Sequence, residues 1–240
     1  MEKDIEITGH ADIIRLSQAF WYAVRTGGDP TPCLDSLRMT GESALAEQLP
    51  NDAAKKAFWI NIYNAHTQLQ LFKHRELYPH RGKFFNTRFV LVAGHRLSLD
   101  DIEHGILRRS KLKWSGGYLN KCFPGKFEKQ FRVDKLDCRI HFALNCGAKS
   151  CPPIAFYEPS SIDRQLDMAT ANYLQTEAAY DGKHNILKLP ALMSWFRADF
   201  GGKKGMLKLL IHQGILPPGK RPKLRFNPYD WTLYLDHYKQ

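Results

Sequence analysis

The segment DAAKKAFWINIYNAHTQLQLFK, residues 52–73, sets the architecture that we expect for this chain. Large and small apolar side chains recur every three or four residues along it: Phe58, Ile62, Ala65, Leu69 and Phe72. This spacing is the period of one face of an α-helix. Residues 57–72 carry no charge on any face, so we expect the helix to be surrounded by protein.

Two asparagines beside this stripe need hydrogen-bond partners if the helix is buried. Leaving a buried amide unpaired costs about 1 to 3 kcal/mol. One interpretation is that Asn61 and Asn64 tie the helix to neighbouring backbone. The other is that one of them orients a catalytic imidazole or polarises a substrate carbonyl, as an asparagine does in papain-like proteases. On that interpretation Asn61 is a candidate catalytic residue and Asn64 a candidate substrate-binding residue.

A second segment, RIHFALNCGAKSCPP at 139–153, contains the best candidate nucleophile. Apolar residues alternate with other residues from 139 to 144, which is the pattern of a half-buried strand. Gly147 permits a tight turn, and the two prolines that end the segment prevent a helix there. We therefore expect Cys146 at the end of a strand, where folds often present functional groups.

The four residues after Cys146 have main-chain amides without an obvious secondary-structure partner. Successive free amides in a turn form a nest that binds anions. We expect this nest to bind an oxyanion of the substrate. Its candidate substrate-binding residues are Gly147, Ala148, Lys149 and Ser150.

A capping box formed by Ser98 and Asp101 predicts a helix at 99–109. Glu103 falls within the apolar stripe of this helix, so its carboxylate must be paired or have a raised pKa. A structural ion pair with an arginine such as Arg139 is one interpretation of Glu103. A role in catalysis is the other.

These residue types suit thiol-based acyl transfer, in which a cysteine attacks a carbonyl and an oriented histidine moves protons. The nearest histidine to Cys146 in the sequence is His141, which is also a candidate catalytic residue, but an extended strand would place the two side chains on opposite faces. His104 is either a hydrogen-bonded boundary residue or, reaching in from its helix, the better partner, with His66 as an alternative. The residues that could orient the histidine are Glu103 and Asn61.

Two other readings of these residues stay open. A zinc site could use His104, His141, Cys146 and Cys151, but the C-x4-C spacing is wider than that of common zinc knuckles, and we expect no metal or cofactor. A non-enzymatic binding module is the alternative to an enzyme for a small-molecule or peptide substrate. The motifs of standard nucleotide-binding, serine hydrolase and zinc protease classes are absent from the sequence.

Four motifs spread over most of the chain resemble the domain-of-unknown-function 547 family. They are AFWINIYNA at 57–65, LSLDDIEHGILR at 97–108, the segment at 139–153 and YDW at 229–231. The family is named for having no established function, so the resemblance implies little chemistry. In the family the last motif usually continues as Ser-Leu-Asn, whereas this chain has Thr232, Leu233 and Tyr234.

The composition predicts a globular protein. The chain has 240 residues, of which 43% are hydrophobic, and neither a linker nor a repeat divides it, so we expect a single domain at 1–240. The expected class is α+β, a helix-rich domain around a small antiparallel sheet, distantly like a cysteine protease. Similar patterns predict helices at 12–26, 43–49, 161–179, 191–200 and 203–213, a hairpin within 84–97, a strand at 186–189 and an extended tail at 222–238.

Charge and cysteine content indicate the surroundings of the protein. The net charge of +11 is concentrated at 108–113, 201–208 and 219–225, which either binds an anionic partner or forms a solvated surface. The five cysteines are an odd number, which favours reduced thiols, although a Cys146–Cys151 disulfide stays open. No secretory signal or membrane span is expected, so the predicted location is cytoplasmic; the oligomeric state is not defined by the sequence.

Overall fold

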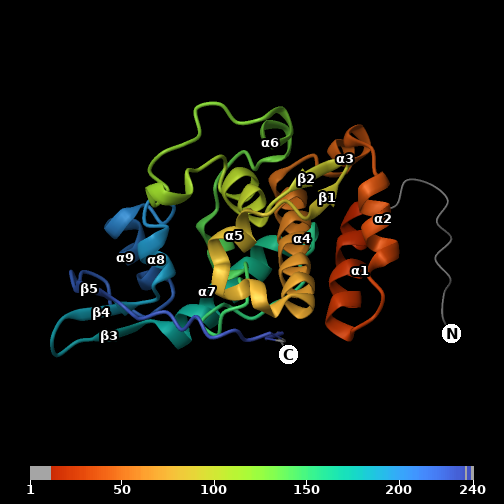
Figure 1. The fold of residues 1–240 in the computed structure, drawn as a ribbon. Coiled ribbons are helices and arrows are strands. Elements are labelled where there is room, and N and C mark those ends of the chain that lie inside the picture. Colours follow the sequence, from red (N-terminus) through yellow and green to blue (C-terminus); the bar gives the residue numbers. More distant parts are fainter. Residues whose placement is uncertain (1–11, 236, 239–240) are drawn as a thin grey trace.

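The structure is a computed structural model of the chain. It describes the chain except for residues 1–11, 236 and 239–240, so these parts of the predicted domain lie outside it. Within the described part the fold is α+β and rich in helix, as predicted, with one antiparallel hairpin and one mixed three-stranded sheet (Figure 1). No helix among these residues is both long and apolar enough to cross a lipid bilayer.

The elements follow one another in this order along the described chain: α1 (Ile13–Thr26), α2 (Thr31–Met39), α3 (Glu42–Gln48), α4 (Asp52–Lys73), η1 (Arg75–His80), α5 (Arg81–Asn86), β1 (Val90–Val92), β2 (His95–Leu97), η2 (Asp101–Leu107), η3 (Lys113–Ser115), α6 (Lys126–Phe131), η4 (Cys138–Phe142), η5 (Pro159–Ser161), α7 (Ile162–Glu177), β3 (Ala179–Asp181), β4 (Ile186–Leu189), α8 (Leu192–Trp195), α9 (Gly202–His212) and β5 (Lys223–Phe226).

Helix α4 is the buried centre of the larger apolar cluster. Asn51 caps its first turn by accepting a hydrogen bond from Ala54 N at 3.0 Å. Helix α1 packs along one side of α4 (Figure 1), and Ala143, which follows η4, accepts a hydrogen bond from Asn64 of α4. The predicted helix at 52–73 and its enclosure by protein are therefore confirmed.

The core consists of two apolar clusters. The larger one joins α1, α4 and the β1–β2 hairpin, and the smaller one joins α7, α8, α9 and β4. Ile140 belongs to the first cluster and Phe142 to the second, so the short helix η4 lies where the two meet. The candidate site lies beside this junction.

The segment at 139–144 forms most of the 3-10 helix η4 (Cys138–Phe142) and the turn after it, rather than the predicted strand. The Asp137 carboxylate accepts a hydrogen bond from Arg139 N and so caps the turn. Its apolar side chains do not cover one face of a sheet. Instead, Ile140 is buried in the larger cluster and Phe142 in the smaller one. The prediction of a strand is therefore wrong.

The helix predicted at 99–109 begins as expected but is wound as a π-helix, η2. The Ser98 hydroxyl accepts from Asp101 N, and the Asp101 carboxylate accepts from Ser98 N, both at 3.0 Å, which is the predicted capping box. Further along, Arg108 N donates to Glu103 O, five residues back. Single π-helical turns are rare and are frequently found at functional sites.

The smaller elements follow the predictions with local changes. Residues Ala93 and Gly94 take positive φ angles of 50° and 74° and close the predicted hairpin, but residues 84–86 belong to α5. Strand β4 pairs antiparallel with β3 and parallel with β5. The helix predicted at 161–179 ends at Glu177, because Ala179 belongs to β3. The helix predicted at 191–200 is confined to α8, and the sequence patterns did not indicate α2.

Candidate functional site

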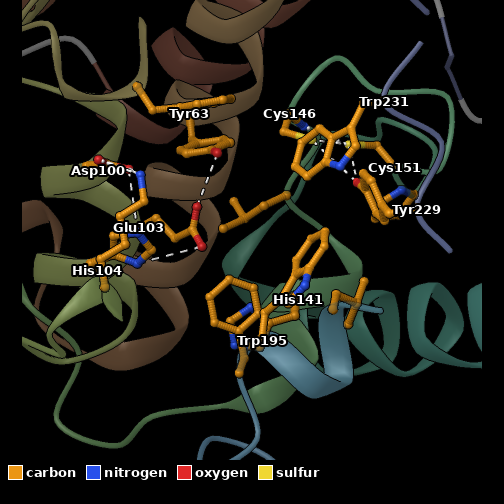
Figure 2. A pocket seen from close by; sticks show the side chains of 16 residues that line it. Tyr63, Asp100, Glu103, His104, His141, Cys146, Cys151, Trp195, Tyr229 and Trp231 are labelled. Carbon is orange, nitrogen blue, oxygen red and sulfur yellow. Dashed lines mark hydrogen bonds and ion pairs between the residues drawn. The ribbon is translucent and has the colours of Figure 1, made fainter. Parts of the chain in front are cut away.

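A cavity of about 300 Å³ lies between η2, α4, α8 and the loop that follows η4. Figure 2 shows Tyr63, Asp100, Glu103 and His104 on one wall, and Cys146, Cys151, Tyr229 and Trp231 on the facing wall. Four of the five predicted catalytic residues line this cavity: Glu103, His104, His141 and Cys146.

The two cysteines of the loop are in direct contact. Cys146 Sγ lies 2.6 Å from Cys151 Sγ, and Tyr229 Oη lies 3.4 Å from the first sulfur and 3.1 Å from the second. Cys146 is half-buried, whereas Cys151 is only 3% exposed. Both cysteines therefore line the cavity, and Cys146 is the more exposed of the two.

These contacts favour a thiolate at Cys146. The hydrogen bond from the Cys151 thiol is the main cause that lowers the pKa of Cys146, against the opposing effect of burial. The Tyr229 hydroxyl and the Ala148 amide act in the same direction. Burial raises the pKa of Cys151 and of Tyr229, so both keep their protons and can donate to the Cys146 sulfur.

The side chains of two asparagines hold the cysteine loop in place through hydrogen bonds. Asn64 Oδ1 accepts from Asn145 N at 2.9 Å, and Asn64 Nδ2 donates to Ala143 O at 2.9 Å. Asn145 Oδ1 accepts from Gly147 N at 2.8 Å, and its Nδ2 donates to Pro152 O at 2.8 Å. Asn64 therefore positions the loop and does not line the cavity.

The predicted catalytic residue Asn61 lies away from the cavity. Its amide donates to Ser17 Oγ at 3.1 Å and to Tyr157 O at 3.0 Å, and it accepts from Tyr157 N at 2.8 Å. The interpretation that Asn61 ties α4 to neighbouring backbone accounts for the two contacts with Tyr157, and the third joins α4 to the Ser17 side chain of α1.

Most of the amides expected to form an anion-binding nest have partners in the described part of the chain. Gly147 N donates to Asn145, and the Lys149 and Ser150 amides donate to main-chain carbonyls of the tail at 2.8 and 3.2 Å. The Ala148 amide contributes to the hydrogen bonding of Cys146. The expectation of free amides at 147–150 is therefore wrong, because the segment at 230–234 pairs with this loop.

The wall opposite the cysteines is a fixed polar cluster. Tyr63 donates to Glu103 Oε2 at 3.2 Å, and Arg108 Nη1 lies 2.9 Å from His104 Nδ1. A guanidinium only donates, so His104 Nδ1 accepts and its proton lies on Nε2, 3.5 Å from Asp100 Oδ1. Both nitrogens of His104 therefore face groups on its own wall, and the structure does not bring this ring to the Cys146 sulfur.

The expected pair between Glu103 and Arg139 does not form. Arg139 instead binds the carboxylates of Asp137, Asp163 and Asp167 at 2.7, 2.6 and 2.8 Å. These contacts hold η4 against α7, on the outside of the junction between the two clusters.

His141 also lines the cavity, and the Asp199 carboxylate orients its ring. Its Nε2 lies 2.9 Å from Asp199 Oδ2, and its ring stacks on Phe196 at a centroid distance of 3.9 Å. Arg108 Nε also binds Asp199, at 2.6 Å, and both partners of this ion pair are fully buried. The strand that would place His141 and Cys146 on opposite faces does not form, because His141 lies in the 3-10 helix η4.

The ionisation states of this cluster follow from its contacts. Burial opposes the charge on Asp199, but the hydrogen bonds from His141 and Arg108 outweigh it and lower the pKa of the carboxyl group. Burial is the main cause that lowers the pKa of His141, with Asp199 opposing it. His141 is therefore a neutral base whose proton lies on Nε2, because the carboxylate can only accept.

Aromatic side chains form the open end of the cavity. Trp195 stacks on Trp231 with centroids 5.5 Å apart, and Tyr229 lies 4.8 and 4.5 Å from these two rings. Arg81 lies over the Trp231 ring at 4.5 Å. Neither Asp199 nor Trp195 was predicted as a site residue, and only the YDW motif pointed to Tyr229 and Trp231.

The candidate zinc ligands are not assembled. Among the described residues, no group of three or more histidine, cysteine, aspartate or glutamate side chains is arranged to hold a metal ion. His104 is engaged with Arg108 and His141 with Asp199, while the two sulfurs face each other.

The fold and the cavity define a helix-rich α+β protein with a cysteine pair at a buried polar and aromatic pocket. The family model described as "Protein of unknown function, DUF547" matches residues 47–174, more than half of the chain, and the chain belongs to this family. The matched part includes α4, η2 and the cysteine loop, whereas Asp199 and Tyr229 lie beyond it. Neither a curated protein nor a solved structure matches the chain, so likeness to a cysteine protease stays a prediction.

Proposed function

We propose that the cavity is the active site of a thiol-dependent enzyme that transfers an acyl group or hydrolyses an amide. The observation that carries this proposal is the placement of Cys146. Its sulfur faces the cavity, contacts two groups that keep their protons, and shares the cavity with a histidine oriented by a carboxylate. These are the parts that covalent catalysis by a cysteine requires.

In the first half of the proposed reaction the Cys146 thiolate attacks the substrate carbonyl carbon. The tetrahedral intermediate collapses to a thioester, and the amine leaves with a proton taken from a solvent water molecule; the hydroxide that remains is neutralised by the proton released to solvent in the second half. In the second half a water molecule gives its proton to His141 Nδ1 while its oxygen attacks the thioester. The acid is released, the Cys146 thiolate returns, and His141 passes the proton to solvent, so protons balance over the cycle.

The His141–Asp199 pair suits the second half reaction. The ring presents the lone pair of Nδ1, because Nε2 carries the proton that Asp199 accepts at 2.9 Å. When Nδ1 takes up a proton the ring becomes an imidazolium, which the neighbouring carboxylate stabilises. Arg108 holds Asp199 ionised, so the carboxylate is available for this role.

The lining of the cavity supports a peptide or a small amide as substrate. Trp195 and Trp231 offer flat apolar faces at the open end, which suit an aromatic or aliphatic acyl group. Across from Cys146, Glu103 receives one hydrogen bond from Tyr63 and has further acceptor positions for an N–H group of the substrate.

The experiment that tests the proposal uses p-nitrophenyl acetate as an activated acyl donor. We expect an acetyl adduct on Cys146, found by mass spectrometry of the digested protein, and slow release of acetate. In the His141→Ala variant the adduct should form and persist, because only the second half reaction loses its base. The matched control His95→Ala changes a histidine that binds Glu42 outside the cavity. Acetylation spread over several nucleophiles, or a Cys146→Ser variant with unchanged turnover, would contradict the proposal.

A second candidate function is binding of an anionic partner. It is favoured by exposed cations near α9 and β5 that take part in no ion pair among the described residues: Lys203, Lys204, Lys208, Lys220, Lys223 and Arg225. Reversing Lys208 to glutamate should lower the salt concentration that elutes the protein from heparin more than Arg38→Glu does, although both substitutions change the net charge by two. Equal shifts would indicate net charge alone.

A further inference from the structure

The contact between Cys146 and Cys151 supports a second chemistry besides acyl transfer. The two thiols belong to one short loop, and their sulfurs are in direct contact. A disulfide requires two cysteines whose side chains already point at each other, because the bond tolerates little displacement of the main chain. This pair meets that requirement in the reduced protein.

The two sulfurs differ in exposure, and this difference decides which thiol reacts first. Both cysteines line the cavity, but Cys146 is half-buried whereas Cys151 is only 3% exposed, so a small molecule in the cavity reaches the Cys146 sulfur first. The Cys151 sulfur also accepts a hydrogen bond from Cys146 N at 3.0 Å. Cys146 is therefore the attacking thiol and Cys151 the resolving thiol.

Hydrogen bonds hold the loop in place just before Cys146 and just after Cys151. Asn145, just before Cys146, binds Pro152 O, just after Cys151, at 2.8 Å. Asn64 fixes Asn145 in turn, and the tail binds the amides of Lys149 and Ser150. Closing a bond between the sulfurs therefore leaves these anchors in place.

We propose that Cys146 and Cys151 form a reversible disulfide by exchange with a small organic disulfide that enters the cavity. The Cys146 thiolate attacks one sulfur of the reagent, which forms a mixed disulfide and expels the first reagent thiolate. Cys151 then loses its proton to solvent, and its thiolate attacks the Cys146 sulfur and expels the second reagent thiolate. The protein gives up two electrons, and the reagent leaves as two reduced thiols.

The disulfide would act as a switch on the cavity. Oxidation removes the thiolate that the proposed acyl transfer needs, and reduction by a dithiol restores it. Formation of the bond does not depend on the proposed function, and only its effect on turnover does. The two ideas can therefore fail separately.

The test uses the full chain and bis(2-hydroxyethyl) disulfide as the probe. After incubation the remaining thiols are alkylated, and the digested protein is analysed by mass spectrometry without reduction. We expect the wild-type protein to lose two alkylation sites and to yield a Cys146–Cys151 linked peptide. The Cys151→Ser variant should instead accumulate the mixed disulfide on Cys146, and Cys146→Ser should leave Cys151 unreacted. Circular dichroism before and after treatment confirms that each serine variant is folded.

Three results would overturn the proposal. They are a persistent mixed disulfide on wild-type Cys146, a reaction of Cys151 in the folded Cys146→Ser variant, and no reaction of either thiol below denaturing conditions. The Cys33→Ser variant is the matched control, since Cys33 is a partly buried thiol outside the cavity. The acetylation experiment is run on reduced protein, so a negative result there leaves the linked peptide as an independent readout.

Discussion

His141 Nε2 lies 2.9 Å from Asp199 Oδ2, and this contact determines which nitrogen of the ring carries the proton. Because the carboxylate can only accept, the proton is on Nε2 and Nδ1 keeps its lone pair. Asp199 is fixed in turn by Arg108, whose Nε lies 2.6 Å away. A residue on η4, one after α8 and one that follows the π-helix thus form one buried unit beside the cavity.

The Asp199→Asn substitution should lower the free energy of unfolding. The change leaves the buried Arg108 guanidinium without its counter-charge, and breaking a buried pair typically costs about 3 to 5 kcal/mol. Urea denaturation measures the free energy of unfolding. The control Asp134→Asn alters a carboxylate that is 83% exposed and 3.9 Å from Lys55, and should change it by less than about 0.5 kcal/mol. Equal effects of both substitutions would show that Arg108 finds another partner.

The His66→Phe substitution should weaken the dependence of the free energy of unfolding on pH in the acidic range. Burial lowers the pKa of His66 to about 3, against about 6.5 in the unfolded chain. Between these values the unfolded state binds more protons, so the free energy of unfolding falls as the pH falls, by up to about 1.4 kcal/mol per unit. The contribution is complete above pH 6.5 and is lost towards pH 3.

Denaturation curves of wild-type and His66→Phe protein between these pH values give the free energy of unfolding of each. The difference between the two proteins reports on His66, because the paired aspartates contribute equally to both. His212→Gln, at an exposed position on α9, should keep the wild-type slope. A slope unchanged in His66→Phe would mean that His66 titrates normally in the folded protein.

The Gly147→Ala variant should disturb the cysteine loop. Gly147 has a φ of +84°, and an added Cβ would lie 2.6 Å from Leu71 Cδ1. Gly214→Ala provides the matched control, since Gly214 has a φ of +71° but no atom within 4 Å of an added Cβ. Both variants lose the conformational freedom of glycine, at a cost of about 1 to 2 kcal/mol, and Gly147→Ala should lose more because of the contact. Similar losses in thermal denaturation would mean that Leu71 moves aside without cost.

Removing the Tyr229 hydroxyl should raise the pKa of Cys146. The hydroxyl lies 3.4 Å from the Cys146 sulfur and donates to its thiolate, so Tyr229→Phe withdraws a group that stabilises the charged form. The pH at which Cys146 is half-reactive towards iodoacetamide should therefore move upwards. Tyr234→Phe changes an exposed tyrosine outside the cavity and should leave this pH where it is.

The sequence predicted elements whose signal is local. The apolar stripe of α4 spans only its own 22 residues, and the capping box of Ser98 and Asp101 involves neighbours along the chain, so both were found at the right positions. The segment around Ile140 was misread because alternation indicates a strand only when one face is buried, and here both sides are covered by different clusters.

The parts of the site that escaped prediction depend on distant contacts. Asp199 lies 58 residues after His141, and Tyr229 lies 83 residues after Cys146, and nothing in the intervening sequence fixes either pairing. The unpaired amides expected after Cys146 were misjudged for the same reason, since their partners come from the tail. Cys146, Glu103 and His104 were placed at one cavity because their own motifs marked them.

The most direct test of the central claim is the reactivity of Cys146 in the folded, reduced protein across pH. Iodoacetamide labelling, with each cysteine quantified by mass spectrometry, compares Cys146 with the exposed Cys122 in the same sample. We predict selective labelling of Cys146 with a midpoint below the value of about 8.5 for a free thiol. Cys146 that stays unlabelled until the protein unfolds, or that reacts only at a higher pH than Cys122, would contradict the account.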